Sequence, residues 1–402
     1  MGLACVAGES VLASDRFSAG PAGSDQFVAV DFYDELCFAH NKPAMTVAVI
    51  RDMVRKFKEA GAAGLTWRLA PLGVAAYPSE HLTKITEIDS VYHNKEMEKR
   101  QNGTPMWWRF DTVCAFTRTL ESIDPNEEIV KACHEAGLQL YFWIDLFDEM
   151  LSKFLCAHPE CLVHTSDGAR YPGLRDYANE TAVRQKLDEL AELYKYRPDG
   201  LYLCSSCHAR HLSFPEPDGA FGTLSAATFT KFLRRLKKEC SPHGVKLMVM
   251  APLGGSLNFN SPYFSSNVKY RIETDWKTWI DEGLADSLVL GDYELLWSQD
   301  GIWRSKGQTD IGPGHSALDV YASEFVKYNC GRSKLYFWCG LFPEKRAEFV
   351  TRSADEAIKH RLDGYLLHEG MLIENEPAVL SAMKDAKRRL SERFPFTAKE
   401  AK

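Results

Sequence analysis

Acidic side chains follow several of the apolar segments in this sequence. Asp31, Asp145, Asp292 and Glu369 each stand at or just after the end of such a segment. A pair of carboxyl groups is what cleavage of a glycosidic bond requires, because one protonates the leaving oxygen while the other attacks the sugar or activates water. The pattern indicates acid–base chemistry, with Asp292 and Glu369 as the first-choice catalytic pair and Asp145 and Asp31 as the next candidates.

Glu369 is the better candidate for the proton donor of this pair. It follows the apolar run Tyr365-Leu366-Leu367, whereas Asp292 is followed by Tyr293 and Glu294. Burial among apolar neighbours disfavours a charged carboxylate and therefore raises its pKa, as a general acid needs. We expect Glu369 to act as the acid and Asp292 as its partner.

Aromatic and polar side chains accompany these carboxylates along the chain. An aromatic face suits the apolar C–H face of a sugar, and fixed polar groups hold its hydroxyls. A single arginine among the carboxylates suggests an acidic substituent on that sugar, such as a uronate, a sulfate or a sialate. We expect the substrate-binding residues to be Arg68, Trp67, Trp143, His208, Tyr293 and Trp338.

A cysteine- and histidine-rich stretch begins at Cys204. The string Cys204-x-x-Cys207-His208 has the form of a c-type haem attachment site, but it is present once and such attachment needs a dedicated export route. Zinc bound by Cys204, Cys207 and His208 or His211 is a more plausible alternative, because thiolates and imidazoles are its usual ligands. Free thiols beside a sugar-binding histidine remain the favoured interpretation, so we expect no cofactor and no metal.

A repeated pattern reveals the elements that must position these residues. A glycine repeatedly precedes an apolar run. This arrangement is typical of a helix that ends at the glycine and is followed by a buried strand. Helical patterns separate the runs, which predicts parallel strands joined by right-handed crossovers. The expected strands lie at 27–31, 64–68, 137–145, 200–204, 244–250, 282–292, 331–339 and 364–369, and the expected helices at 45–60, 125–136, 181–196, 226–239, 275–282, 317–328, 353–360 and 377–391.

Eight strand–helix units most simply close into a (β/α)8 TIM barrel, an α/β fold. An open doubly wound sheet is the alternative, but the first strand is not followed by a glycine-rich phosphate loop. Long segments follow the second and third strands, at 71–124 and 149–179. Barrel enzymes build their sites at this end of the strands, so we expect these segments to be functional loops.

Alternation along each strand indicates which side chains face the barrel axis. Placing the aliphatic residues against the helices turns Asp31, Arg68 and Asp145 inward, together with Trp143 and Trp338. The same reasoning turns further residues inward, namely Ala29, Thr66, Tyr141, Tyr202, Cys204, Tyr336, Tyr365, Leu367 and Glu369.

Composition narrows the class of protein. The 402 residues carry a net charge of -7, without a cluster of basic residues, so nothing indicates nucleic-acid binding. No apolar stretch is long enough to suggest a membrane span. The 11 cysteines are scattered and odd in number, which favours free thiols in the cytoplasm, unless an export signal has been removed. We expect a flexible leader at 1–24, a single barrel domain at 25–394 and a tail at 395–402; oligomeric state stays open.

Several short motifs resemble a known family. His158-Pro159-Glu160, Asp167-Gly168, the run 174–179, Val183-Arg184 and the segment 199–203 resemble the bacterial glycosyl-hydrolase-like (family-10-like) TIM-barrel proteins, and so do Asp275-Trp276 and Glu282-Gly283-Leu284. The resemblance covers most of the barrel, and it implies a (β/α)8 fold and carbohydrate substrates. Many members carry an aspartate just after the fourth strand, where this chain has Cys204 and Ser205.

Three functions are therefore compatible with the sequence. The leading hypothesis is a glycoside hydrolase that uses a carboxylate pair, with an acidic sugar as the substrate that Arg68 suggests. The first alternative is a metal-assisted sugar isomerase or hydrolase that uses His208, His211 and the cysteines. The second alternative is a sugar-binding barrel that no longer catalyses a reaction, because it lacks the fourth-strand aspartate.

Overall fold

The computed structural model describes most of the chain. The described residues are 25–31, 45–70, 73–87, 110–147, 149, 152–164, 170–205, 221–251, 256–258, 269–291, 295–297, 303–305, 316–340, 345–368 and 370–393.

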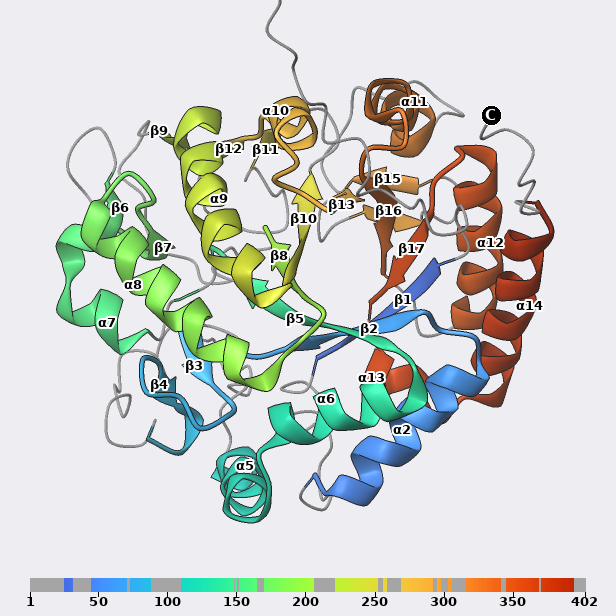
Figure 1. The fold of residues 1–402 in the computed structure, drawn as a ribbon, viewed down its shortest axis with the longest axis horizontal. Helices are drawn as coiled ribbons and strands as arrows, with labels where there is room; N and C mark the ends of the chain where they lie inside the picture. The colour runs from blue at the N-terminus through green and yellow to red at the C-terminus, as the bar shows by residue number, and fades with distance from the viewer. Residues whose placement is uncertain are drawn as a thin grey trace, which may run out of the picture.

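Eight parallel strands form a closed barrel at the centre of the molecule (Figure 1). Neighbouring strands follow one another in chain order around the barrel, and the last strand pairs with the first. This confirms the (β/α)8 TIM-barrel fold. The barrel strands are β1 (Asp25–Val30), β2 (Gly64–Arg68), β5 (Gln139–Asp145), β8 (Gly200–Cys204), β10 (Lys246–Ala251), β13 (Ser287–Leu290), β16 (Lys334–Cys339) and β17 (Gly364–Leu367).

Helices surround the barrel and cover its outer face (Figure 1). The apolar face of α2 packs on the barrel core, with Ile50, Met53, Val54 and Phe57 buried. The helices are α2 (Val47–Glu59), α5 (Phe110–Ser122), α6 (Pro125–Ala136), α7 (Lys153–Ala157), α8 (Glu180–Ala191), α9 (Ala226–Cys240), α10 (Trp276–Asp281), α11 (Ala317–Asn329), α12 (Arg346–Lys359), α13 (Gly370–Ile373) and α14 (Pro377–Arg393).

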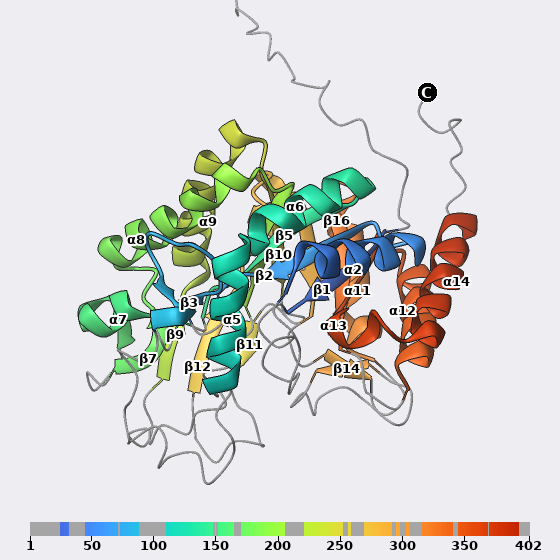
Figure 2. The same cartoon turned by 90° about the horizontal axis from the view of Figure 1, so that it is seen from below.

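Short extra strands gather on one side of the barrel, toward the bottom of Figure 2. They occur in segments that leave the carboxyl ends of barrel strands, which is where barrel enzymes build their sites. The pairs are β3 (Val74–Ala75) with β4 (Thr83–Lys84), β6 (Leu162–His164) with β7 (Arg170–Arg175), and β14 (Leu295–Trp297) with β15 (Trp303–Ser305); β9 (Phe221–Leu224), β11 (Ser256–Asn258) and β12 (Lys269–Glu273) form a three-stranded sheet.

All eight predicted strands and all eight predicted helices are present, but the segment 149–179, predicted as a loop, contains helix α7 and the strands β6 and β7. Helix α12 begins at Arg346 rather than at 353, and the segment 71–124, predicted as a loop, contains the 13-residue helix α5. The loop prediction failed because the many aromatic and polar residues of this segment obscured the helical periodicity of its last third.

Local signals fix the helix ends. Helix α6 begins after Asp124, whose side chain accepts a hydrogen bond from the backbone N–H of Asn126, and Pro125 occupies its first turn. It ends at Gly137, which has the left-handed φ of 65° that the repeated glycines predict. Gly200 has a different role, because a β-carbon there would collide with the Tyr141 ring inside the barrel.

Strand pairing determines which side chains face the barrel axis, because paired residues of parallel strands point to the same side. Thr66 pairs with Tyr141, and Arg68 pairs with Trp143. Trp143 pairs with Tyr202, and Asp145 pairs with Cys204. These inward faces agree with the alternation read from the sequence.

Strand β17 has the opposite parity to the prediction. Tyr365 pairs with Gln26, and its hydroxyl donates a hydrogen bond to the Gln26 side chain, which is itself bonded to the backbone of the helix layer. Tyr365 and Leu367 therefore face the helices, while Leu366 and His368 face the axis. The strand contains two adjacent leucines, so aliphatic character alone could not identify its outer face.

No helix within the described ranges is long and apolar enough to cross a membrane.

Candidate active site

Three buried charged residues meet at the carboxyl ends of adjacent strands. Arg68 ends β2, Asp145 ends β5, and Asp31 directly follows β1. The Arg68 guanidinium donates from Nη1 to Asp31 Oδ2 at 2.5 Å and from Nε to Asp145 Oδ2 at 2.7 Å. All three side chains are at most 4% exposed. Arg68 therefore joins two carboxylates that come from opposite sides of its own strand.

Trp143 completes this cluster. Its indole Nε1 donates a hydrogen bond to Asp145 Oδ1 at 2.9 Å, so both oxygens of that carboxylate are engaged. The Arg68 guanidinium carbon lies 5.0 Å from the centre of the Trp143 ring, within the range of a cation–π contact. The position of Asp145 is therefore set by two neighbours, one charged and one aromatic.

His368 lies between the two tryptophans that face the axis. Its ring centre is 5.5 Å from that of Trp143 and 4.9 Å from that of Trp338. All three rings are buried. Sequence reasoning missed His368, because it assigned the wrong parity to the last strand; the histidine following an apolar run was the available signal.

The net charge of this cluster indicates whether an acidic sugar would be attracted to it. Arg68 faces two carboxylates, so the three side chains together carry one negative charge when ionised. An acidic sugar would bring a further negative charge to the same place. The arginine is thus engaged in ion pairs within the protein, and the acidic sugar inferred from it has no support in this geometry.

Trp67 does not lie where a substrate-binding residue should. It pairs with Val30 on the outer face of the barrel, and its Nε1 donates a hydrogen bond to Asn126 Oδ1 of α6 at 3.2 Å. The side chain is fully buried. The prediction for Trp67 is corrected: it packs between the strands and the helix layer, because its position alternates with the inward Arg68.

Cys204 faces the axis at the end of the fourth barrel strand and is fully buried. Burial and the neighbouring Cys204 raise the pKa of the Tyr202 hydroxyl well above its ordinary value, so that the hydroxyl stays neutral. The other members of the zinc alternative, Cys207, His208 and His211, lie outside the described residues.

Four of the predicted site residues, with His208 among them, lie outside the described part of the chain. They are the first-choice catalytic pair Asp292 and Glu369, together with Tyr293 and His208. Their roles stay predictions.

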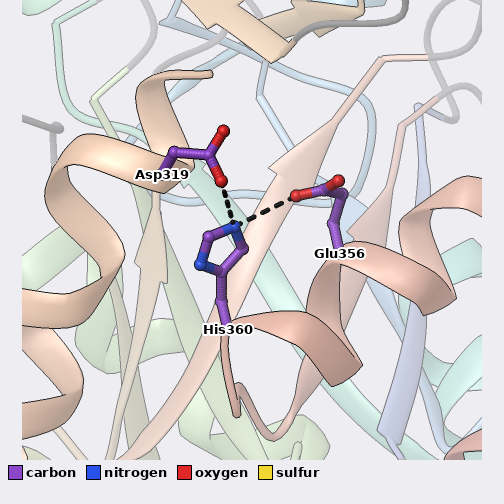
Figure 3. Close-up of side chains that lie close together, drawn as sticks. All are labelled: Asp319, Glu356 and His360. Atoms are coloured by element: carbon purple, nitrogen blue, oxygen red, sulfur yellow. Dashed lines mark hydrogen bonds and ion pairs between the residues drawn. The ribbon is translucent and has the colours of Figure 1, made fainter. Parts of the chain in front are cut away.

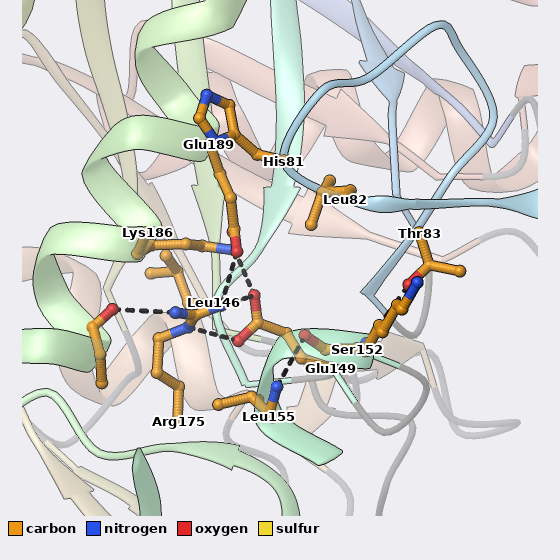
Figure 4. Close-up of polar contacts among 12 residues, drawn as sticks. His81, Leu82, Thr83, Leu146, Glu149, Ser152, Leu155, Arg175, Lys186 and Glu189 are labelled. Carbon is orange, nitrogen blue, oxygen red and sulfur yellow. Dashed lines mark hydrogen bonds and ion pairs between the residues drawn. The ribbon is translucent and has the colours of Figure 1, made fainter. Parts of the chain in front are cut away.

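A second buried charge network lies beside the barrel, between the segment after β5 and helix α8 (Figure 4). Arg175 donates from Nε to Glu149 at 2.7 Å and from Nη2 to Glu189 at 2.8 Å, and Lys186 also bonds to Glu149. Each of the four side chains is at most 6% exposed. Two positive and two negative charges are therefore buried together, and the network has no net charge.

The side chains of this network stay ionised although they are buried. Burial alone would raise the pKa of Glu149, but the charges of Arg175 and Lys186 outweigh it and lower that pKa below its ordinary value. Burial would lower the pKa of Lys186, but Glu149 and Glu189 outweigh it and raise that pKa. The sequence signal was Lys186 and Glu189, two charged residues on the face of α8 that packs inward.

A small cavity connects the two clusters. Trp143 and Asp145 line it on one side, and Glu149, Lys186 and Glu189 line it on another. Its space suits about one water molecule rather than a sugar ring. The buried network thus lies behind the end of β5 and supports the strand that carries Asp145.

Solved structures share this fold at low sequence identity. The glycoside hydrolase domain of PgaB (BpsB) from Bordetella bronchiseptica has a TM-score of 0.53 and 12% identity, over 90% of this chain and 98% of that domain. The maltogenic alpha-amylase AmyB from Thermotoga neapolitana has a TM-score of 0.50 and 11% identity, over 92% of this chain and 77% of that one. At such identity the likeness shows the TIM-barrel fold.

Sequence comparison adds no closer relative. No protein-family model matches the chain, and no curated protein sequence matches it significantly. The resemblance to family-10-like proteins therefore stays an expectation.

Proposed function

We propose that this protein is a glycoside hydrolase that acts on a neutral carbohydrate. The observation that carries the proposal is the cluster of Asp31, Arg68 and Asp145 against Trp143, at the end of the barrel where barrel enzymes place their catalytic groups. Fixed carboxylates beside buried aromatic rings suit a sugar. The glycoside hydrolases that share the fold support the same class of reaction.

Within this proposal, Asp31 and Asp145 are hydrogen-bond acceptors rather than proton donors. Both carboxylates accept hydrogen bonds from the Arg68 guanidinium, so protonating either would weaken an ion pair. The general acid must then be another carboxyl group. The predicted inward position of Glu369 rested on the same parity as Tyr365 and Leu367, which face the helices, so its candidacy rests on the sequence alone. Glu369 stays our candidate for the acid, with Asp292 as its partner.

Substitution of the first-choice pair tests these roles. We expect Glu369→Gln to lower turnover of a responsive glycan about a hundredfold or more, since a general acid typically contributes that much. Asp292→Asn should be nearly as severe. Both variants should keep the thermal stability and the glycan affinity of the wild type. Activity of Glu369→Gln within a factor of about three of the wild type would remove Glu369 from the mechanism.

A charged-sugar comparison tests the neutral substrate. Matched neutral and uronate-containing glycans should be assayed side by side, and we expect turnover of the neutral member only. Faster turnover of the uronate would contradict the neutral-sugar proposal without contradicting hydrolysis itself.

One observation favours a second candidate, a sugar-binding barrel that does not catalyse. The inward position beside Asp145 on the fourth strand holds Cys204, a buried thiol, where the family resemblance implies an aspartate. Glycan binding measured by calorimetry, with no product across a broad glycan panel, would establish this alternative. Product formation by the wild type that Glu369→Gln abolishes would exclude it.

A further inference from the structure

Three side chains able to bind a metal meet between helices α11 and α12, outside the active-site cluster. Asp319 lies in the first turn of α11, Glu356 lies in the last turn of α12, and His360 caps the end of α12. His360 Nε2 is 3.2 Å from Asp319 Oδ1 and 3.1 Å from Glu356 Oε2. Figure 3 shows the imidazole pointing between the two carboxylates.

Local structure holds each of these groups in place. Asp319 Oδ2 accepts a hydrogen bond from the backbone N–H of Ser316 in a capping box, which leaves Oδ1 toward His360. Glu356 and His360 are one helical turn apart and therefore share a face of α12. The His360 side chain is only 10% exposed. The three groups are thus fixed by two helices before any ligand arrives.

From this geometry we infer that Asp319, Glu356 and His360 form a binding site for a divalent transition metal, with zinc as the best match. Imidazole nitrogens and carboxylate oxygens both bind zinc, and a bound water would complete four ligands. Ligands about 2.05 Å from a tetrahedral zinc lie about 3.3 Å from one another. The two distances to His360 are close to that value, and the three donor atoms all lie within 4.8 Å.

The Lys359 ammonium contacts the same carboxylate oxygens that would bind the metal, so it would compete with the metal for them. Its ammonium lies 2.5 Å from Asp319 Oδ1 and 3.6 Å from Glu356 Oε2. Its side chain is 53% exposed, so it can turn into solvent when a metal binds. Lysine is a flexible monovalent cation. A divalent ion that coordinates the same two oxygens directly would therefore replace it. A bound metal would tie α11 to the end of α12, four residues before β17 begins at Gly364.

Isothermal titration of the full, untagged chain with zinc chloride tests the inference. We expect His360→Ala to weaken zinc binding about tenfold or more, and Glu356→Gln to weaken it similarly. Lys359→Met should tighten it several-fold, because the competing ammonium is gone. The matched control is Glu348→Gln, an exposed carboxylate on the same helix that pairs with Arg352, and it should leave the affinity unchanged.

Two outcomes overturn the inference. One is equal zinc affinity of the wild type and His360→Ala, with both folded by circular dichroism. The other is loss of zinc binding in Cys207→Ser but not in His360→Ala, which would place the metal at the cysteine-rich stretch instead. Neither result depends on catalytic activity, so the inference stands or falls apart from the proposed function.

Discussion

Arg68 shows how a single residue can join the first three strands of the barrel. It places a positive charge between Asp31 and Asp145, and all three side chains are shielded from water. A buried ion pair is weak in net stability, but removing one partner leaves an uncompensated charge. The residue is therefore important for stability whether or not it also contacts a substrate.

We expect Arg68→Leu to lower the free energy of unfolding by about 3–5 kcal/mol, because two buried carboxylates then lose the guanidinium that each contacts. Urea unfolding followed by tryptophan fluorescence measures the change. The matched control is Arg234→Leu, which removes a two-contact ion pair with Glu282 that is exposed to solvent. That variant should lose about 1 kcal/mol or less. Equal losses in the two variants would contradict the assigned role of Arg68.

At the scale of elements, the segment after β5 is held to helix α8 by charge as well as by apolar contact. Glu149 accepts bonds from Arg175 and Lys186, which come from strand β7 and helix α8. The network lies directly behind the strand that ends at Asp145, and the two share a cavity. Weakening it should therefore loosen the support of the candidate site.

The network predicts acid sensitivity with a definite sign. The folded-state pKa of Glu149 lies below its ordinary value of 4.5. A carboxylate with a lowered pKa contributes stability that is present above its unfolded-state pKa and is lost as pH falls through the folded-state value. The difference in unfolding free energy between the wild type and Glu149→Gln should thus be largest near pH 7 and shrink below about pH 4.5.

Thermal and urea unfolding at several pH values between 3 and 7 measure this difference. Glu180→Gln is the matched control, because Glu180 begins the same helix but forms an exposed pair with Arg235. Its effect should be small at every pH. A difference for Glu149→Gln that stays constant down to pH 3 would show that the carboxylate charge does not stabilise the fold.

At the scale of the whole molecule, closure of the barrel depends on the pairing of β1 with β17. Asp25 pairs with Gly364, and a β-carbon at position 364 would collide with the backbone carbonyl of Asp25. Because the obstacle is backbone in a closed sheet, it cannot move without shifting both strands. The glycine is thus required by close approach rather than by a left-handed conformation.

We expect Gly364→Ala to destabilise the protein by about 3 kcal/mol or more, at the upper end of the cost of overpacking. The comparison variant is Gly331→Ala. Gly331 has a left-handed φ of 77° but open space around it, so its cost should be about 1–2 kcal/mol. Urea unfolding of both variants measures which substitution lowers the free energy of unfolding more. A smaller loss for Gly364→Ala would mean that β1 and β17 separate easily.

Local patterns in the sequence determined the barrel and much of its inner face. Alternation of apolar residues and helix-ending glycines such as Gly137 depend on near neighbours in the chain, so they can be read without coordinates. The same alternation placed Asp31, Arg68 and Asp145 on the inward side. It could not show that the arginine pairs with both carboxylates, because that depends on the spacing of three strands.

Only the tertiary structure decided the parity of the last strand and the two clusters away from the axis. Tyr365 faces outward because Gln26, 339 residues away in the chain, accepts its hydroxyl there, and His368 faces inward as a consequence. Asp319 and His360 meet because two helices pack side by side. Contacts between residues so distant in sequence are set by the closed barrel and its helix layer, and no local pattern encodes them.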